Sequence, residues 1–501
     1  MNGREAPYMK PVDSVIAQVG AVARAHPNDP ALMADGCTWT YRELWARTET
    51  YARAVLSSGA APGDVVGLIG SNEPAYLAAY LGIMRAGCAT AAISTMIAPS
   101  SVRAQLAAAG ARVVITGRLA DDTRDALAGD YLLLDLAEPP TGAGAFDLPE
   151  VGPDTTAIIM MTSGSSGEPK GAQHTHASLF HAVWQMASAF PHHRGDRGVV
   201  FLPLYTCTPE QALPTLCTGG SLDILPGFDP ERVADACVHA TTFDAVPTIM
   251  SRLLEHAPLH KLANLRWILF ASEPMPVHLL QRWWDELPGV ETHQFYGMTE
   301  LLTLTAAPHA LLRQVPSTVG RAFPSTGIVL DPVEGHGSDE GEIVASSPSC
   351  MRGYLNNPAA TDAALTSEHA LRTGDIGRFD ERGLLYLTGR VKDIIISGGF
   401  NIAPAEIETV AFANPGVREA VVVGIPSDRW GETPVVVAVP TAGSALTAMD
   451  LLRDCRARLS TYKRPSAAAL VPTLPTTGIG KVDKVRVKKM IESGEIRITT
   501  P

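Results

Sequence analysis

The feature that most constrains the fold is an alternation of short apolar runs with amphipathic stretches, which begins near Asp64. The apolar runs are 65–69, 90–94 and 113–115, and the amphipathic stretches between them are 76–84 and 102–109. Segments of these lengths in this order are typical of β-α-β units, whose strands form a largely parallel sheet covered on both faces by helices. A loop rich in Pro, Gly and Ala at 138–153 then leads into another apolar strand, 157–161. The pattern predicts an α/β protein.

The chain is long enough for more than one hydrophobic core. Its 501 residues are 46% hydrophobic, which exceeds the needs of a single core. After the sequence Gly-Arg-Val-Lys-Asp at 389–393, shorter strand-like pieces alternate with helical stretches. We therefore predict a boundary at about Lys392, with a large N-terminal domain at 1–391 and a small α+β C-terminal domain at 392–501.

Composition argues against several kinds of partner. Charged residues make up 18% of the chain and the formal net charge is -12, which argues against a nucleic-acid surface or an anionic membrane surface. No apolar run approaches the roughly 20 residues needed to span a bilayer, and the start of the chain has no leader pattern, so we expect a cytoplasmic protein. The seven cysteines form no Cys-x-x-Cys pair, which argues against structural zinc and a disulfide framework. We expect them to be small core residues.

The most specific segment is Thr162–Gly171, with the sequence Thr-Ser-Gly-Ser-Ser-Gly-Glu-Pro-Lys-Gly, directly after the strand that ends at Met161. Hydroxyls and glycines between a strand and an expected helix at 177–190 allow O–H and backbone N–H groups to converge on phosphate oxygens, and Lys170 adds positive charge. A Walker A loop is one alternative, but that motif needs Gly-Lys-Ser/Thr, whereas Pro169 precedes the lysine here. An ordinary flexible Ser/Gly turn is the other alternative.

A second segment, 294–300, combines an aromatic residue, a glycine, a hydroxyl and a carboxylate. Tyr296 is suited to stacking on a purine, and Gly297 permits close approach to a substrate. Thr299 and Glu300 offer oxygen ligands for phosphate and Mg²⁺. Taken alone, a tyrosine such as Tyr296 is more often an ordinary core aromatic, and a carboxylate such as Glu300 more often an ordinary residue at a helix start.

Two further segments carry charged residues next to glycines. Asp375 follows a glycine and can accept hydrogen bonds from both hydroxyls of a ribose, and Arg390 can donate to the same sugar or to phosphate. The loop 474–481 presents Lys481 after Gly478 and Gly480. Taken alone, these residues are a turn aspartate, a solvated charge cluster and a solvent-facing lysine.

The occurrence of these segments in this order resembles the adenylate-forming superfamily, which comprises acyl-CoA synthetases, adenylation domains and luciferases. The similarity covers nearly the whole chain and includes 39–44, 62–66, 246–248, 341–343, 353–354, 424–426, 431–432 and 462–465. The resemblance implies a large N-terminal domain of sheets flanked by helices, and a small mobile α+β C-terminal domain that covers the site. It also implies ATP, AMP, Mg²⁺ and coenzyme A as ligands.

The resemblance further implies a role for individual residues. By similarity, the triphosphate is embraced by Thr162, Ser163, Gly164, Ser165, Ser166, Gly167 and Lys170, while Ser272, Glu273, Pro274, Tyr296 and Gly297 lie beside adenine. Thr299 and Glu300 match the phosphate and Mg²⁺ positions, Asp375 the ribose anchor, Arg390 its neighbour, Gly399 the pantetheine passage, Lys392 the hinge and Lys481 the bridge between carboxylate and α-phosphate. Lys481, Thr162, Lys170 and Glu300 are thereby the expected catalytic residues.

The same resemblance bears on the acid and the thiol. Relatives that activate α-amino acids carry an aspartate after the strand at 199–204, whereas this chain has Tyr205-Thr206-Cys207-Thr208. Because an uncompensated ammonium is costly to bury, we expect an acid without an α-amino group. The expected pocket walls are Tyr205, Thr206, Val246, Pro247, Phe295 and Gly297, which suit an aryl, alkyl or polycyclic acid. No carrier domain is attached, which favours CoA, although a separate carrier protein stays open.

Two positions depart from the pattern of the superfamily. Most relatives have histidine where this chain has Thr206, and they tend to have Gly-Gly or Gly-Ala where it has Ala271-Ser272-Glu273. Added Cβ atoms and a carboxylate can crowd the base or repel phosphate. One hypothesis is that adenylation is weak and that the enzyme takes acyl-AMP from a second ligase. The alternative is that these positions tolerate substitution and that the changes do not affect activity. A non-catalytic binding protein is a third, against which the retention of Lys170 and Lys481 argues.

Overall fold

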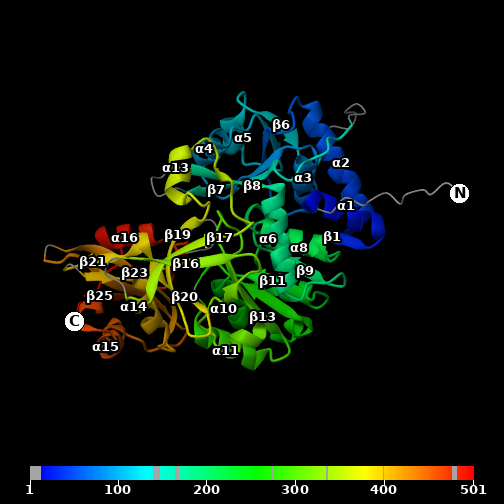
Figure 1. Cartoon of the computed structure of the whole chain (residues 1–501). Coiled ribbons are helices and arrows are strands. Elements are labelled where there is room, and N and C mark those ends of the chain that lie inside the picture. The colour runs from blue at the N-terminus through cyan, green and yellow to red at the C-terminus, as the bar shows by residue number, and fades with distance from the viewer. Residues whose placement is uncertain are drawn as a thin grey trace.

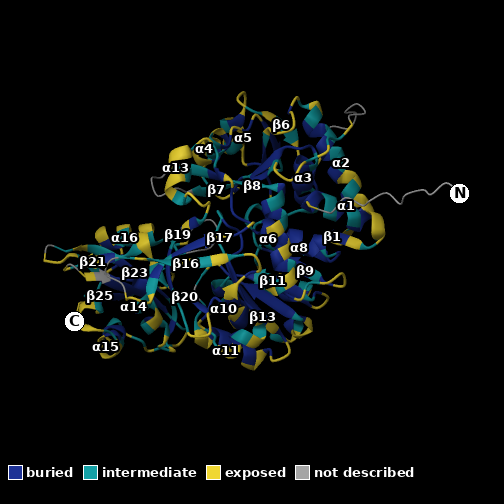
Figure 2. Ribbon diagram, viewed as in Figure 1, coloured by how far each residue is buried: buried dark blue, intermediate teal, exposed yellow. Residues whose placement is uncertain are grey.

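The computed structural model describes residues 13–138, 147–163, 169–273, 275–333, 337–398, 400–427, 429–476 and 482–500. Three β-sheets and their helices form most of the chain, and a fourth sheet with its own helices forms the last part (Figure 1). Buried residues concentrate on the strands and on the helix faces that cover them (Figure 2). Sheets flanked by helices and a smaller C-terminal α+β unit confirm the predicted fold class.

The predicted β-α-β alternation forms a seven-stranded sheet of order β18-β8-β7-β4-β3-β5-β6. Its strands are β3 (Val65–Ile69), β4 (Ala89–Ala92), β5 (Val113–Thr116), β6 (Leu132–Asp135), β7 (Thr156–Ser163), β8 (Pro169–Thr175) and β18 (Gly353–Tyr354). The helices between these strands are α3 (Pro74–Arg85), α4 (Pro99–Ala109) and α5 (Asp121–Leu127), and α2 (Tyr41–Ser57) packs on α3. Strands β3 to β7 are parallel, as expected, because each returns through a covering helix or loop.

A nine-stranded sheet of order β15-β14-β13-β12-β11-β9-β10-β1-β2 lies beside the first. Its strands are β1 (Pro30–Ala34), β2 (Cys37–Thr40), β9 (Arg197–Val200), β10 (Ser221–Ile224), β11 (Thr242–Ala245), β12 (Trp267–Phe270), β13 (Glu291–Tyr296), β14 (Thr305–Ala307) and β15 (Arg321–Ala322). One face is covered by α9 (Pro230–Cys237), α10 (Pro247–His256) and α11 (Val277–Glu286). The other is covered by α6 (His176–Ala189), α7 (Leu204–Cys207), η1 (Thr208–Ala212), α8 (Leu213–Cys217) and α1 (Val15–Ala25). The short elements η2 (Leu259–Asn264) and α12 (His309–Leu312) lie in connections.

The covering segment 204–217 contains one π-helical turn, η1. The backbone N–H of Leu213 donates to the carbonyl of Thr208, and Pro209 has no N–H to donate within the turn. The strand predicted at 199–204 therefore ends earlier than expected, at Val200, because Pro203 caps α7. Single π-turns of this kind are frequent at functional sites.

The remaining strands of the large part form an antiparallel sheet of order β16-β17-β19-β20. Its members are β16 (Gly327–Pro332), β17 (Glu340–Ser346), β19 (Leu371–Phe379) and β20 (Leu385–Arg390), with α13 (Pro358–Ala364) inserted before β19. The turn η3 (Val391–Asp393) follows β20 directly and leads into the last unit. The boundary predicted at Lys392 falls in this turn and stays a prediction.

The last unit is built on a sheet of order β22-β21-β24-β23, with β25 beside β24. Its elements are β21 (Ile395–Ser397), β22 (Phe400–Ile402), α14 (Pro404–Phe412), β23 (Val417–Ser427), β24 (Gly431–Pro440), α15 (Ala448–Arg458), η4 (Thr461–Lys463), β25 (Ala467–Leu470) and α16 (Lys484–Glu492). Alternating valines of β23 and β24 point to opposite faces and enter two separate cores. The unit thus buries both faces of its own sheet.

Two sequence expectations concern cysteines and membranes. Six of the seven cysteines are buried as expected, but Cys37 is exposed because it lies at the start of the edge strand β2. All seven are free thiols. Within the part of the chain that the structure describes, no helix has the length and apolar character needed to cross a bilayer.

Candidate active site

The predicted phosphate segment is the connection of a β-hairpin. Thr162 near the end of β7 pairs with Lys170 at the start of β8, and the Thr162 hydroxyl donates to the carbonyl of Lys170 at 3.4 Å. The helix expected at 177–190 is confirmed as α6, but the antiparallel strand β8, which lies between this segment and α6, was not expected. Gly164, Ser165, Ser166 and Gly167 lie outside the described residues, as does the side chain of Ser163.

Two residues from separate segments, Tyr296 and Arg390, contact the carboxylate of a third, Asp375. The Tyr296 hydroxyl donates to Oδ2 of Asp375 at 2.6 Å, and Nε of Arg390 donates to Oδ1 at 2.7 Å. Asp375 on β19 and Arg390 on β20 are cross-strand partners, whereas Tyr296 ends β13 of the other sheet. Burial and the Asp375 charge raise the pKa of Tyr296 well above its usual range. The Asp375 oxygens keep lone pairs that can accept hydroxyl groups of a sugar.

A second cluster joins the hairpin to the segment after β13. The Tyr354 hydroxyl donates to Oε1 of Glu300 at 2.6 Å, and Nζ of Lys170 lies 5.5 Å from the centre of the Tyr354 ring. Tyr354 reaches both residues because β18 pairs with β8. Burial and the Glu300 charge raise the pKa of Tyr354. Tyr354 was not predicted as a site residue. The only signal in the sequence was its place in 353–354, one of the segments that resemble the adenylate-forming superfamily.

A buried histidine fixes the backbone between Tyr296 and Glu300. Nε2 of His174 lies 2.7 Å from the carbonyl oxygen of Thr299, and burial lowers the pKa of His174 to about 4, so the ring is neutral near pH 7. A Cβ on Gly297 would overlap the backbone oxygen of Leu302. The glycine is therefore required by the packing of this turn. No sequence pattern singled out His174.

The predicted walls of the acid pocket lie at the carboxyl ends of three strands of the nine-stranded sheet. Tyr205 and Thr206 follow β9, and Val246 and Pro247 follow β11. Phe295 is the second-last residue of β13. Binding crevices of α/β sheets lie at this edge. The hydroxyl of Thr206, which stands where histidine was expected, donates to the carbonyl of Pro203 at 2.9 Å.

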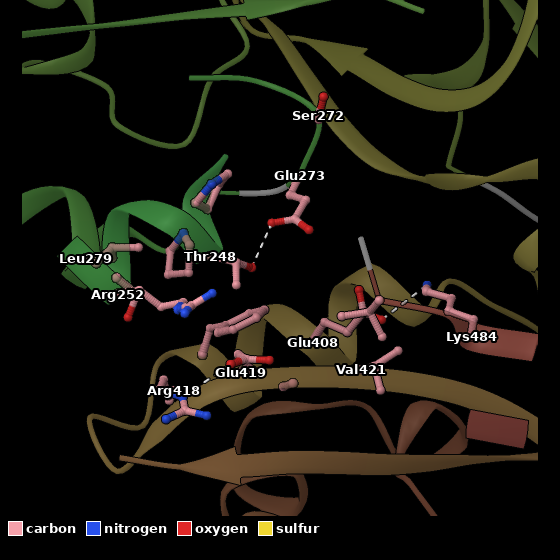
Figure 3. Close-up of a pocket in the computed structure, with 16 residues that line it drawn as sticks. Thr248, Arg252, Ser272, Glu273, Leu279, Glu408, Arg418, Glu419, Val421 and Lys484 are labelled. Carbon is pink, nitrogen blue, oxygen red and sulfur yellow. Dashed lines mark hydrogen bonds and ion pairs between the residues drawn. The ribbon is translucent and has the colours of Figure 1, made fainter. Parts of the chain in front are cut away.

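A cavity of about 200 Å³ lies between the large part of the chain and the last unit (Figure 3). Ser272 and Glu273, after β12, line one side, and Glu408 and Lys484 of the last unit line the other. The Thr248 hydroxyl donates to Glu273 at 3.0 Å, which directs that carboxylate toward the start of α10. Ser272 has φ of 75°, a conformation that favours glycine.

Several predicted residues lie near the junction of the two parts. Lys392 lies in η3, and Asp393 beside it pairs with Lys484 at 3.5 Å. Pro274, Gly399 and Lys481 lie outside the described residues. The structure thus brings together Tyr296, Asp375 and Arg390. It separately places Lys170 and Glu300 around Tyr354.

The described residues contain no group of three or more His, Cys, Asp or Glu side chains arranged to hold a metal ion. Glu300 offers hard oxygen ligands and lies on the same tyrosine, Tyr354, as Lys170. Mg²⁺ usually keeps several waters and uses one or two carboxylates together with substrate phosphates. Among the described residues, this carboxylate therefore fits a magnesium ion that arrives with a nucleotide.

Comparison with protein families gives two matches along the chain. Residues 20–355 match the model of the AMP-binding enzymes, and residues 406–481 match the model of the AMP-binding enzyme C-terminal domain. A feruloyl-CoA synthase of Amycolatopsis sp. is 35% identical over 493 residues, which cover 93% of this chain and 97% of that protein.

Two solved structures resemble the whole chain. ATP-bound MatB from Rhodopseudomonas palustris superposes with a TM-score of 0.88 at 27% identity, covering 96% of this chain and 99% of MatB. The o-succinylbenzoate CoA synthetase MenE from Bacillus subtilis, in complex with its acyl-adenylate intermediate, superposes with a TM-score of 0.83 at 26% identity, covering 94% and 97% of the two chains.

Proposed function

Because this chain belongs to the family of AMP-binding enzymes, we propose that it is an AMP-forming acid–CoA ligase that converts a carboxylic acid to its CoA thioester through an acyl-AMP. The observation that carries the proposal is the convergence of Tyr296 and Arg390 on the buried carboxylate of Asp375. This arrangement presents an aromatic ring, a sugar-binding carboxylate and a cation on one site. Similarity to CoA ligases over nearly the full length supports the same activity.

In the proposed first step, the acid carboxylate attacks the α-phosphorus of ATP and pyrophosphate leaves. Negative charge grows at the phosphoryl group, and cationic groups next to it lower the barrier. Lys170 and Lys481 are the lysines proposed for this role, and Asp375 holds the ribose. Glu300 is the residue proposed to bind Mg²⁺, which supplies further positive charge to the phosphates.

In the proposed second step, the thiol of CoA attacks the acyl carbonyl and AMP leaves. The thiol must reach the carbonyl from the side on which Lys481 lies in the first step. A rotation of the last unit about Lys392 would exchange one for the other. The turn η3 supports this role, because it is a short connection between two units with separate cores.

The two steps can be separated in a Lys481→Ala variant. We expect adenylation to fall roughly 10² to 10³-fold, a typical loss for one charge-stabilising donor, while thioester formation from supplied acyl-AMP is spared. Pyrophosphate release reports the first step and CoA ester formation the second. An equal loss in both steps would reject the assigned role of Lys481.

The acid is proposed to be an aryl, alkyl or polycyclic acid without an α-amino group. A hydroxamate or pyrophosphate-release screen over aryl, fatty and terpenoid acids, with free CoA in the second step, tests the ligase activity directly. Turnover of an acid with ATP and free CoA supports it and argues against a separate carrier protein. Absence of AMP formation with every acid in the panel would refute it.

The departures at Thr206 and Ser272 leave a second hypothesis, in which a second ligase supplies the acyl-AMP. The left-handed backbone of Ser272 supports weak adenylation, whereas Glu273 accepts a hydrogen bond from Thr248 at the start of α10, which argues against a repulsive role for that carboxylate. Rates from free acid plus ATP are compared with rates from synthetic acyl-AMP, both with CoA present. Comparable rates for any good acid would eliminate this hypothesis.

A further inference from the structure

Asp244 points to the face of the nine-stranded sheet that carries the proposed acid pocket. Its neighbours on β11, Phe243 and Ala245, pack on the opposite face against α9 to α11. Asp244 pairs in register with Leu269 of β12, and Leu269 packs with Met186 of α6. Because register partners in parallel strands share a face, Asp244 points toward α6 and the segment that contains η1.

A second carboxylate lies near Asp244. Glu210 lies on η1, about one turn beyond Thr206. Burial, together with the charge of Glu210, raises the pKa of Asp244 well above its usual range. Burial, together with both carboxylates, raises the pKa of the Cys207 thiol as well. The geometry places them close together, because Gln211, next to Glu210, donates to the carbonyl of Val199, and Val199 pairs in register with Phe243, next to Asp244.

Asp244 has no compensating contact among the described residues. Its carboxylate makes no hydrogen bond or ion pair with any residue in this part of the chain. Although protein surrounds it closely enough to desolvate it, the side chain keeps accessible surface. This combination is expected of a side chain at the edge of a binding pocket rather than of one in close packing.

Two neutral side chains near Asp244 each carry an oxygen that is unsatisfied within the described residues. The Thr242 hydroxyl lies two residues before Asp244 on the same face of β11, and it is buried without a partner. Oε1 of Gln211, next to Glu210, is likewise buried without a partner, while its Nε2 donates to the carbonyl of Val199 at 2.9 Å. Buried polar groups are almost always paired, so a missing ligand is expected here.

We propose that Glu210 and Asp244 bind a basic nitrogen at the end of the acid substrate remote from its carboxylate, which makes the substrate an ω-amino or aminoalkyl-aryl acid. The inference rests on the proposed ligase function. Asp244 lies two residues before Val246 on one face of the strand, roughly 7 Å deeper along it. A substrate whose carboxylate lies at the strand ends thus brings its far end to the pair.

The chemistry of the pair favours a cation over a neutral group. Two carboxylates in one desolvated region repel each other, and a protonated amine between them relieves that repulsion while donating three hydrogen bonds. The oxygen of Gln211 provides a further acceptor. The basic group is distal, so it agrees with the absence of an aspartate in the segment that binds an α-amino group in relatives.

The test compares matched acids in the pyrophosphate-release assay. One series contains 4-(aminomethyl)cinnamate, 4-(hydroxymethyl)cinnamate and 4-ethylcinnamate, which differ only in the terminal group. A second series pairs ω-amino acids of increasing length with alkanoic acids of equal heavy-atom number. For at least one length we expect kcat/KM to favour the amine by about 30-fold or more over its neutral partner.

Asp244→Asn and Glu210→Gln keep the size of each side chain and remove its charge. In each variant we expect the preference for the amine over its neutral partner to fall by about 30-fold or more. Glu231→Gln, on the exposed first turn of α9, is the matched control and should leave the ratio unchanged. Asp244→Asn should also raise the Tm without substrate, because a carboxyl group whose pKa is raised by burial costs stability at neutral pH.

The outcomes separate this inference from the ligase function. Turnover of the neutral acids with no amine preference at any length would overturn the inference and leave the ligase function intact, and so would a preference for the hydroxymethyl acid. A lower Tm for Asp244→Asn would reveal a structural partner and would also overturn it. Failure of every acid in both series, and in the wider panel, would remove the ligase function and this inference together.

Discussion

Acidification should destabilise the large part of the chain by protonating buried histidines. Burial lowers the pKa of His174, His176, His192 and His293 to about 4. In the unfolded chain each ring binds a proton near pH 6.5. The folded state therefore loses stability as the pH falls from about 6.5, and the loss is complete only below about 4.

The size of the effect follows from the number of protons. Each histidine contributes roughly 3 kcal/mol to the free energy of unfolding near pH 7, all of which is lost below pH 4. Between those limits, unfolding takes up as many as four protons, so the free energy of unfolding should fall by about 5 kcal/mol per pH unit near pH 5. The loss is steep enough to unfold a typical domain.

Urea unfolding at several pH values, followed by tryptophan fluorescence, measures this slope. Trp267 is a suitable reporter because the ring of His192 packs edge-on against it with centroids 4.8 Å apart. Both ring nitrogens of His176 lack a partner within the described residues, so His176→Leu should stabilise the protein at acid pH and lower the slope by about 1.4 kcal/mol per pH unit. His260→Gln, at an exposed position, is the control. A free energy of unfolding that is constant between pH 6.5 and 4.5 would refute the reasoning.

Three substitutions at the site have distinct expected effects. Tyr296→Phe keeps the ring but removes a hydrogen bond to the Asp375 carboxylate, so KM for ATP should rise roughly 10 to 100-fold while KM for the acid changes little; a similar rise in both would contradict this. Gly297→Ala should lower the Tm by several degrees in a thermal melt, because the added carbon overlaps a backbone oxygen, and an unchanged Tm would show that the turn yields. Tyr354→Phe should raise the Mg²⁺ concentration needed for half-maximal pyrophosphate release about 10-fold, because Glu300 loses the group that orients it, and an unchanged requirement would count against that role.

The β-α-β part of the fold was predictable because its signal is local. The strand predicted at 65–69 is β3 with identical bounds, and the helix predicted at 76–84 lies inside α3, where every one of these residues is buried. The return strand β8 was missed because Pro169–Thr175 is mostly polar and carries a buried histidine, which gives no apolar alternation. Its antiparallel pairing with β7 is a tertiary contact that the residues of β8 alone do not encode.

The residue types of the site were predictable, but their contacts were not. Tyr296 and Asp375 stand 79 positions apart, and only the folded structure shows that the hydroxyl of one meets the carboxylate of the other. Asp244 left a fainter signal, a single carboxylate inside the short apolar strand β11. Its significance depends on Glu210, which lies on the π-turn of the segment that covers the sheet.

The ion pair between Asp375 and Arg390 also limits how the two parts of the chain can move. Arg390 is the final residue of β20, and the turn toward the last unit begins at the next position. The ion pair thus holds the end of β20 to β19 before the connection to the last unit begins. A rotation of the last unit would therefore not extend beyond this ion pair, and the proposed sugar-binding carboxylate of Asp375 would keep its position. One bound nucleotide could then remain in place through both orientations of the last unit.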